Sequence, residues 1–233
     1  MKKKMLAALA TNKFSLAVSP PVQSMDYVKA ALKGGADAIK LHCNVSHFAS
    51  GNQFGTFQDL KAFFKEVVDL AGNVPVGLVP GADEAFITKA ERFEMEEIGI
   101  SFYSVYDKHA PPFLFESEVM TRMIAAHYDY DDMLLKAITR DPRIDVVESS
   151  LIRPEDYGKA LSYKDVLRYR YISENVRQPT MVPTQKNIKP DEVRHLYEAG
   201  CRAVMIGIKV MDEESPEACL RAASMFREAI DKL

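Results

Sequence analysis

Cysteine is scarce in this chain, which has three cysteines in 233 residues. Their number is odd and they lie far apart, so they match neither a disulfide framework nor the close spacing of a zinc site. We expect Cys43, Cys201 and Cys219 to be small buried residues of a reduced protein. This predicts a cytoplasmic location and no cysteine-bound metal.

Long apolar runs are also missing. No stretch approaches the roughly 20 residues that a membrane-spanning helix needs, so we expect no membrane partner. The N-terminus, MKKKMLAALATNK, begins like a signal peptide, but its apolar part, Met5–Ala10, is short and is closed by Asn12 and Lys13. We expect a short N-terminal helix there rather than an export signal.

Neither sign of charge is in large excess, because the formal net charge is −3 at pH 7. Proteins that bind nucleic acids carry a basic surface, so we expect no nucleic-acid partner. The glycine-rich fingerprint of dinucleotide-binding folds does not follow the first apolar run, Phe14–Val18. We therefore expect no redox cofactor.

The clearest local pattern lies near the C-terminal end. The buried runs Thr180–Pro183 and Ala203–Ile208 flank a helix over Pro190–Ala199, which begins with a proline and ends at Gly200. A strand, a helix and a second strand this close together form a right-handed parallel crossover.

This unit repeats along the whole chain. We predict eight strands, and between them helices over 25–32, 57–70, from Thr88 to Gly99, 111–118, 131–139, 159–176, 190–199 and 216–232. The predicted strands are 14–18, 38–42, 75–79, 100–105, 121–126, 144–148, 180–183 and 203–208. With no linker or break in composition, this pattern predicts one domain over residues 1–233. Its fold class is α/β, a single (β/α)8 TIM barrel with a short N-terminal helix; an open doubly wound sheet is the alternative.

The turn after the last strand is a candidate phosphate site, because the loops after the last two strands of such barrels commonly bind phosphate. Gly207 lets an anion approach the backbone beside Ile208, and Lys209 supplies positive charge. The alternative is a tight turn with a solvated lysine. Further candidates for binding the ligand lie after other strands, namely Ser19, Asn44, Gln185 and Lys186.

Two stretches resemble a known superfamily. NIKPDEVRHLYEAGCRAVMIGIKV and SLAVSPPVQSMDYVKAALKGGADAIKLH resemble the ends of ribulose-phosphate-binding β/α barrels, and look most like N-acylmannosamine-6-phosphate epimerases. The resemblance implies a barrel that binds a phosphorylated small molecule and places the phosphate at Gly207. Thr184 stands where those epimerases carry a glutamate, and the third strand, in VPVGLVPG, lacks their lysine.

Acid–base chemistry is predicted at the ends of two other strands. Strand periodicity puts Ala38, Lys40 and His42 on one face, and Glu148 ends the sixth strand. The second and sixth strands of a barrel lie opposite each other, so Lys40 and Glu148 can meet above its centre. A desolvated lysine can act as a base or Schiff-base amine, and a histidine can pass protons. A structural ion pair is the alternative.

The long polar loop after the second strand, residues 43–55, indicates a lid or a substrate-binding loop. His42 and His47 leave a metal site open as an alternative, although the loop has no carboxylate to complete it, and we expect no metal. His109, with Asp107 near it, and His127 are secondary candidates, whereas His195 falls on an outer helix.

We therefore predict an enzyme without a cofactor: an isomerase, epimerase or lyase acting on a small phosphorylated, sugar-phosphate-like metabolite. Lys40, Glu148 and His42 are its expected catalytic residues. The alternative is a non-catalytic barrel that binds or senses such a ligand. A metal-dependent hydrolase is less compatible with the sequence, and association into a homo-oligomer stays open.

Overall fold

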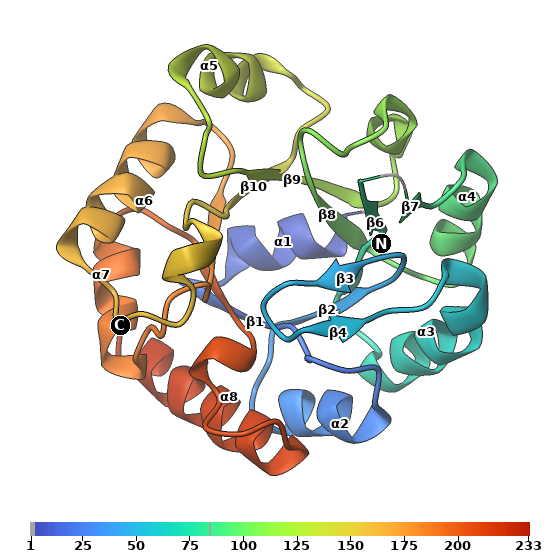
Figure 1. Cartoon of the computed structure of the whole chain (residues 1–233), viewed down its shortest axis with the longest axis horizontal. Coiled ribbons are helices and arrows are strands. Elements are labelled where there is room, and N and C mark those ends of the chain that lie inside the picture. The colour runs from blue at the N-terminus through green and yellow to red at the C-terminus, as the bar shows by residue number, and fades with distance from the viewer. Residues whose placement is uncertain (1–2, 84) are drawn as a thin grey trace.

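The computed structural model describes residues 3–83 and 85–233 of the chain. Eight parallel strands close into a barrel in the order β1-β12-β11-β10-β9-β8-β5-β2 (Figure 1). Their bounds are β1 Ser15–Val18, β2 Ala38–His42, β5 Val76–Val79, β8 Phe102–Tyr106, β9 Thr121–Ala126, β10 Val146–Ser149, β11 Thr180–Pro183 and β12 Ala203–Ile206. The predicted TIM barrel and all eight of its strands are confirmed.

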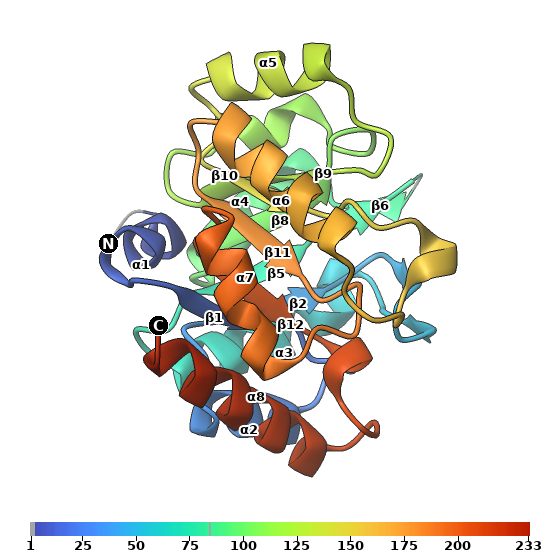
Figure 2. The same ribbon diagram turned by 90° about the vertical axis from the view of Figure 1, so that its left-hand side faces the viewer.

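Helices surround the barrel and connect successive strands (Figures 1 and 2). Their bounds are α2 Met25–Lys33, α3 Phe57–Ala71, α4 Lys89–Glu97, α5 Asp132–Arg140, α6 Tyr163–Asn175, α7 Val193–Glu198 and α8 Pro216–Asp231. The predicted capping box of α4 is present, since Thr88 accepts from the N–H of Glu91 and the Glu91 carboxylate accepts from the N–H of Thr88. Short 3-10 helices occupy several connections, namely η1 Pro112–Glu116, η2 Pro154–Asp156, η3 Pro190–Glu192 and η4 Ile208–Val210.

Two predicted elements differ from the structure. The segment 111–118 forms η1 instead of an α-helix, because two adjacent prolines, Pro111 and Pro112, remove backbone donors at its start. The last strand ends at Ile206 rather than Ile208. The N–H of Gly207 turns to the hydroxyl of Thr184, and the chain then enters η4.

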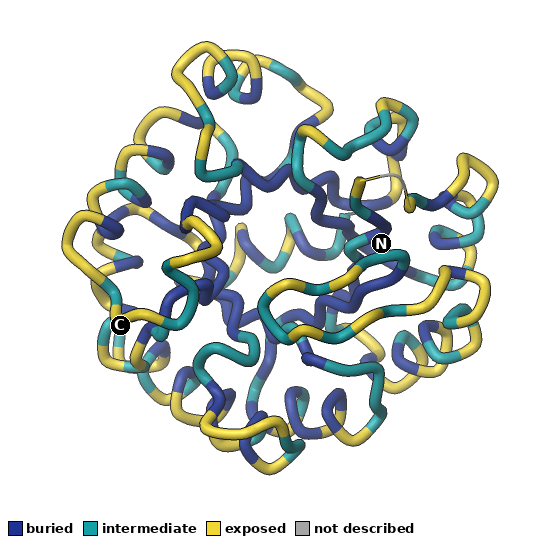
Figure 3. Tube along the Cα trace, viewed as in Figure 1, coloured by how far each residue is buried: buried dark blue, intermediate teal, exposed yellow. Residues whose placement is uncertain are grey.

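The barrel interior has its own core, separate from the layer between strands and helices (Figure 3). Inward side chains alternate along each strand. Gly77 of β5 is required here, because a Cβ at this position would lie 2.4 Å from the ring of Phe102. The interior core consists of Met5, Leu9, Ala17, Ala38, Phe102, Met123, Val146, Met181, Ala203 and Met205.

The N-terminal end of the barrel is closed by helix α1, Lys4–Thr11, as predicted (Figure 2). Its Met5 and Leu9 are buried against the interior core. Beside it, Asp145 accepts hydrogen bonds from Nε of Arg122 at 3.0 Å and from Nζ of Lys3 at 2.7 Å. Arg122 also donates to the carbonyl groups of Phe115 and Pro142, so this end is closed by apolar contacts and a saturated ion cluster.

Two hairpins stand at the opposite end, where the strands have their carboxyl termini. The loop after β2 folds into the hairpin β3–β4, Ser46–His47 and Asn52–Gln53, which crosses the mouth of the barrel (Figure 1). The second hairpin, β6–β7, pairs Gly81–Ala82 with Ala85–Phe86. Within the described part of the chain, no helix has the length and apolar character required to span a bilayer.

Candidate active site

Three strands present the same sequence of side chains to the barrel interior. The lowest residue is apolar and belongs to the interior core, and the two above it on the same face are polar. From bottom to mouth the residues are Ala38, Lys40 and His42 on β2, Phe102, Ser104 and Tyr106 on β8, and Val146, Glu148 and Ser150 at β10. The polar side chains therefore form two layers above an apolar floor.

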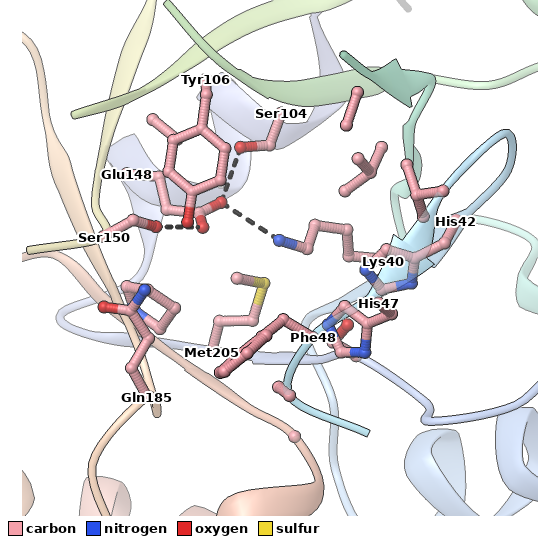
Figure 4. A pocket seen from close by; sticks show the side chains of 18 of the residues that line it. Lys40, His42, His47, Phe48, Ser104, Tyr106, Glu148, Ser150, Gln185 and Met205 are labelled. Atoms are coloured by element: carbon pink, nitrogen blue, oxygen red, sulfur yellow. Dashed lines mark hydrogen bonds and ion pairs between the residues drawn. The ribbon is translucent and has the colours of Figure 1, made fainter. Parts of the chain in front are cut away.

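Lys40 and Glu148 meet in the lower polar layer, across the barrel from one another (Figure 4). Lys40 Nζ lies 3.2 Å from Glu148 Oε2, and the two residues are 6% and 5% exposed. The Glu148 carboxylate also accepts the hydroxyl of Ser104 on Oε2 at 2.6 Å and that of Ser150 on Oε1 at 2.8 Å. The expected convergence of lysine and glutamate is present in the structure.

The hydrogen bonding of this pair is incomplete. A carboxylate has about four lone-pair positions, and three of those of Glu148 accept from described residues, which leaves one on Oε1. Among the described residues, the ammonium of Lys40 has Glu148 as its one hydrogen-bond acceptor, so two of its three donors are unused. Both partners therefore retain valence for a ligand.

Electrostatics keep Glu148 ionised. Burial raises the pKa of its carboxyl group, but the charge of Lys40 and the hydrogen bonds from Ser104, Ser150 and Lys40 outweigh burial. The net result is a pKa below the ordinary value for glutamate. Glu148 is thus a carboxylate at neutral pH and can accept a proton.

Two histidines lie above Lys40, under the β3–β4 hairpin. The ring of His42 stacks on Phe54 at 4.9 Å and lies 4.4 Å from that of His47, and Nδ1 of His42 is buried without a partner among the described residues. Burial, then His47 and Lys40, hold the pKa of His42 well below its usual value. Burial, then the charges of Lys40 and Lys209, lower the pKa of His47 to about 4. Both rings are neutral at pH 7.

A cavity of about 290 Å³ opens above the pair toward the mouth. Lys40, His42 and Glu148 line it together with Ser19, Gly207 and Lys209. The size falls near the lower end of the range for small-molecule sites, about 300–1,000 Å³. The cavity therefore joins the acid–base pair of β2 and β10 to the turn after β12.

The turn after β12 differs in detail from the simple cradle expected from the sequence. The N–H of Gly207 donates to Oγ1 of Thr184 at 3.1 Å. The N–H groups of Ile208 and Lys209 have no acceptor among the described residues. A Cβ on Gly207 would make an ordinary contact of 3.6 Å with the carbonyl of Ser19, so the glycine leaves open surface rather than relieving a clash.

The remaining candidates lie at different places. Gln185 is at the cavity, where its Oε1 accepts the N–H of Ile152 at 3.1 Å. The ammonium of Lys186 is turned to Asp165 of α6, 3.6 Å away, and Lys186 does not line the cavity. Asn44 stands at the base of the hairpin with φ 56° and donates to the carbonyl of Pro80, also outside the cavity lining.

Sequence reasoning did not assign a role to Ser104, Tyr106 or Tyr157, which line the cavity. Ser104 and Tyr106 had a usable signal, because they share the inward face of β8 with Phe102. Tyr157 had none, since it follows a 3-10 helix in an irregular connection.

The secondary candidates are placed on one side of the mouth. His109 lines the cavity with its Nδ1 3.4 Å from Asp83, whereas His127 pairs with Asp129, and its ring lies 5.2 Å from that of Tyr106. Asp107 accepts the N–H of the next residue, and His195 lies on the outer helix α7. No group of three or more His, Cys, Asp or Glu side chains within residues 3–83 and 85–233 is arranged to hold a metal ion.

Comparison with known proteins defines the fold but no family. No family model matches the sequence, and no curated protein is significantly similar to it. A thiamine phosphate pyrophosphorylase from Pyrococcus furiosus superposes with a TM-score of 0.66 at 13% identity, over 95% of this chain and 97% of the other. A mutant tryptophan synthase alpha-subunit from the same organism gives 0.67 at 16%, over 99% and 100%. The native KDPGal structure gives 0.63 at 12%, over 93% and 94%.

At these identities the likeness concerns the fold. It supports the (β/α)8 superfamily that the two sequence stretches resemble. The finer resemblance to N-acylmannosamine-6-phosphate epimerases has no counterpart among the structures compared above.

Proposed function

We propose that this chain is an isomerase, epimerase or lyase for a small phosphorylated, sugar-phosphate-like metabolite, working without a redox cofactor. The observation that carries the proposal is the buried Lys40–Glu148 pair, which faces a cavity with unused hydrogen-bonding valence on both partners. Burying two charges is costly unless they are fully satisfied. An incompletely satisfied pair at the carboxyl ends of barrel strands is therefore better explained by catalysis than by stability.

In the proposed reaction, Glu148 removes a proton from the carbon next to a substrate carbonyl, using the open lone pair of Oε1. An N–H of Lys40 donates to the carbonyl oxygen and stabilises the charge that develops there. Return of a proton to the other carbon or the other face gives the isomer or epimer. His42, held neutral, lies beside this reaction zone and assists by hydrogen bonding.

The phosphate is proposed to lie against the turn after β12. The free N–H groups of Ile208 and Lys209 point to an anion there, and the ammonium of Lys209 has no ion-pair partner among the described residues. Ser19 and Thr184 supply hydroxyl groups on the same side of the cavity. The neighbours named for a phosphate ester, such as the thiamine phosphate pyrophosphorylase, show that this fold serves such substrates elsewhere.

The test is exchange of substrate carbon-bound hydrogen with solvent. Aldose, ketose and N-acylamino-sugar phosphates are incubated with the protein in heavy water and followed by proton NMR, which detects enolisation whatever the final product. We expect exchange with at least one of them, reduced about 1,000-fold or more in Lys40→Met. Lys61→Met is the matched control, because it removes a lysine from a surface ion pair of 2.7 Å with Glu94.

The lyase version makes a further demand on Lys40. If its amine condenses with the carbonyl, water is released and an imine forms, which borohydride reduces to a stable secondary amine. Mass spectrometry then finds the adduct on the peptide that contains Lys40. Exchange without such an adduct leaves the isomerase or epimerase and removes the Schiff-base lyase.

One observation favours a non-catalytic binding barrel as the second candidate. Lys40 and Glu148 already contact each other in this structure, as a purely structural bridge would. A sugar phosphate that binds the wild type and Lys40→Met equally well, with no exchange in either protein, would establish that alternative.

A further inference from the structure

A row of hydroxyl groups leads away from Glu148. The hydroxyl of Ser150 donates to Oε1 of Glu148 at 2.8 Å. The phenol of Tyr106 is hydrogen-bonded to Ser150 on one side and to the phenol of Tyr157 on the other. The hydroxyl of Tyr157 accepts in turn from Nε2 of Gln185. Three consecutive hydroxyls thus connect the catalytic carboxylate to a side-chain amide.

The two ends of this row fix the direction of every hydrogen bond in it. Glu148 is ionised and can only accept, whereas the amide nitrogen of Gln185 can only donate. The orientation of the Gln185 amide is set because its oxygen accepts the N–H of Ile152 at 3.1 Å. A hydroxyl has one proton, so Tyr157 must donate to Tyr106 and Tyr106 to Ser150. All three protons point toward Glu148.

The row also crosses from the interior to the mouth. Glu148 is 5% exposed, whereas Tyr157 is half-buried at the rim, where its ring meets that of Phe48 edge-on at 5.4 Å. Tyr106 lies between these ends, on the inward face of β8 above Ser104 (Figure 4). Its phenol also stays protonated, because burial raises its pKa. The row therefore joins a buried carboxylate to solvent through groups that keep their protons.

We propose that Ser150, Tyr106 and Tyr157 form a proton relay between Glu148 and water at the mouth of the barrel. The relay rests on the proposed function, in which Glu148 is the base, and it adds three positioning residues that act through it. In the resting order, a proton enters at Tyr157 from water while the protons of Tyr157, Tyr106 and Ser150 each move one group inward and Glu148 is protonated. When Glu148 carries the substrate proton, each hydroxyl turns and the same moves run outward, releasing one proton to water.

The relay has a consequence that simple acid–base catalysis lacks. The hydrogen taken from the substrate is exchanged with solvent before it is returned, although the carboxylate itself is shielded from water. Tyr106→Phe interrupts the relay and leaves the Ser150–Glu148 hydrogen bond in place. The proton then remains on Glu148 and goes back to the same substrate molecule.

The first measurement needs no substrate. Tyrosine labelled with carbon-13 at Cζ reports the hydrogen bonding of each phenol by NMR. In Ser150→Ala the Tyr106 and Tyr157 signals are expected to shift together, while that of Tyr163, which is 73% exposed, stays in place. A Tyr106 signal that does not respond overturns the relay whatever the protein catalyses.

The second measurement uses a substrate that the wild type turns over in heavy water. Tyr106→Phe is expected to raise severalfold the fraction of product that retains substrate hydrogen, with KM unchanged. Tyr157→Phe, at the rim, is the second variant should Tyr106→Phe fold poorly. Tyr171→Phe is the control, because its hydroxyl bonds Asp132 on the outer surface.

The outcomes separate the two proposals. Turnover in the wild type with the same retained fraction in Tyr106→Phe and Tyr157→Phe overturns the relay and keeps the proposed function. Absence of exchange in the wild type with every phosphate overturns the proposed function, and the relay then has no proton to carry.

Discussion

The barrel contains two buried ion clusters, one at each end, and they are built differently. At the N-terminal end, the carboxylate of Asp145 accepts from Lys3 and from both the backbone and the side chain of Arg122. At the mouth, Lys40 makes one contact of 3.2 Å with Glu148, and both face a cavity. The lower cluster is saturated and includes backbone groups, whereas the upper pair is held by side chains and has valence to spare.

The covers of the two ends differ in the same way. Helix α1 buries Met5 and Leu9 in the interior core, with 0% and 3% exposure. The β3–β4 hairpin crosses the mouth with Phe48 67% exposed. In this fold the N-terminal face serves stability and the carboxyl face serves chemistry. The two ends of this barrel follow that division down to individual hydrogen bonds.

The largest expected effect is on turnover at the mouth. Glu148→Gln keeps the shape of the side chain but removes the base, so we expect hydrogen exchange to fall about 1,000-fold, or about 4 kcal/mol of transition-state stabilisation. The measurement is the NMR exchange rate in heavy water. Retention of more than a tenth of the wild-type rate would remove Glu148 from its catalytic role.

The next effect compares the stability of the two ion clusters. In Arg122→Met/Asp145→Met, the N–H of Arg122 and the carbonyls of Phe115 and Pro142 lose their partners, so we expect a loss of about 3 kcal/mol or more. Lys40→Met/Glu148→Met removes side-chain partners alone, and a buried pair replaced by apolar residues is often neutral or stabilising. Urea unfolding at pH 7 measures both, and equal losses would contradict the comparison.

A third prediction concerns the lower cover. Leu9→Ala leaves a cavity between α1 and the interior core, so we expect unfolding free energy to fall by about 2–4 kcal/mol. Leu6, partly buried at the same core, is the control position, because Leu6→Ala removes a less enclosed side chain and should cost less. A Leu9→Ala protein as stable as the wild type would show that α1 is not required to close the barrel.

Mild acid should weaken the mouth before the lower end. His42 and His47 have folded pKa values below the unfolded value of about 6.5, so the unfolded chain takes up protons first and stability falls as pH drops from 6.5 toward 4. We expect wild type to lose about 1–2 kcal/mol between pH 7 and 5. The pKa of Asp145 lies below its ordinary value, so the lower cluster stays charged in this window.

The histidine effect is isolated with a neutral replacement. His47→Gln can keep the hydrogen bond to Ser50, which Nδ1 of His47 makes at 2.8 Å, but does not titrate. Urea unfolding at pH 7 and pH 5 should then show a smaller loss than in the wild type. An unchanged loss would mean that other groups set the acid sensitivity.

The strands and the central pair were predictable from the sequence for a physical reason. Each strand is a short buried run punctuated by glycine or proline, and closure of eight such strands fixes which ones face each other. Lys40 and Glu148 meet because the period of a strand turns both inward, as Ala38 and Val146 in the core show.

The rest of the site depends on contacts between distant segments. Lys186 follows β11 as a ligand-binding lysine would, but its partner Asp165 comes from α6. Tyr157 reaches the cavity from an irregular connection, and the hairpin over the mouth is a two-residue pairing on each side. No local pattern encodes such placements, because they depend on where other segments of the fold lie.

The smallest expected effect tests the upper cover. Phe48 touches Tyr157 edge-on at 5.4 Å but remains 67% exposed, so Phe48→Ala should change unfolding free energy by less than about 0.5 kcal/mol. Its role is to limit access to the cavity, and we expect KM for an exchanging substrate to rise severalfold while kcat changes little. Exposed Phe93, at 49% on helix α4, gives the control Phe93→Ala, which should change neither constant. A large loss of stability in Phe48→Ala would place the hairpin with α1, as a permanent part of the fold, and would remove the difference between the two ends of the barrel.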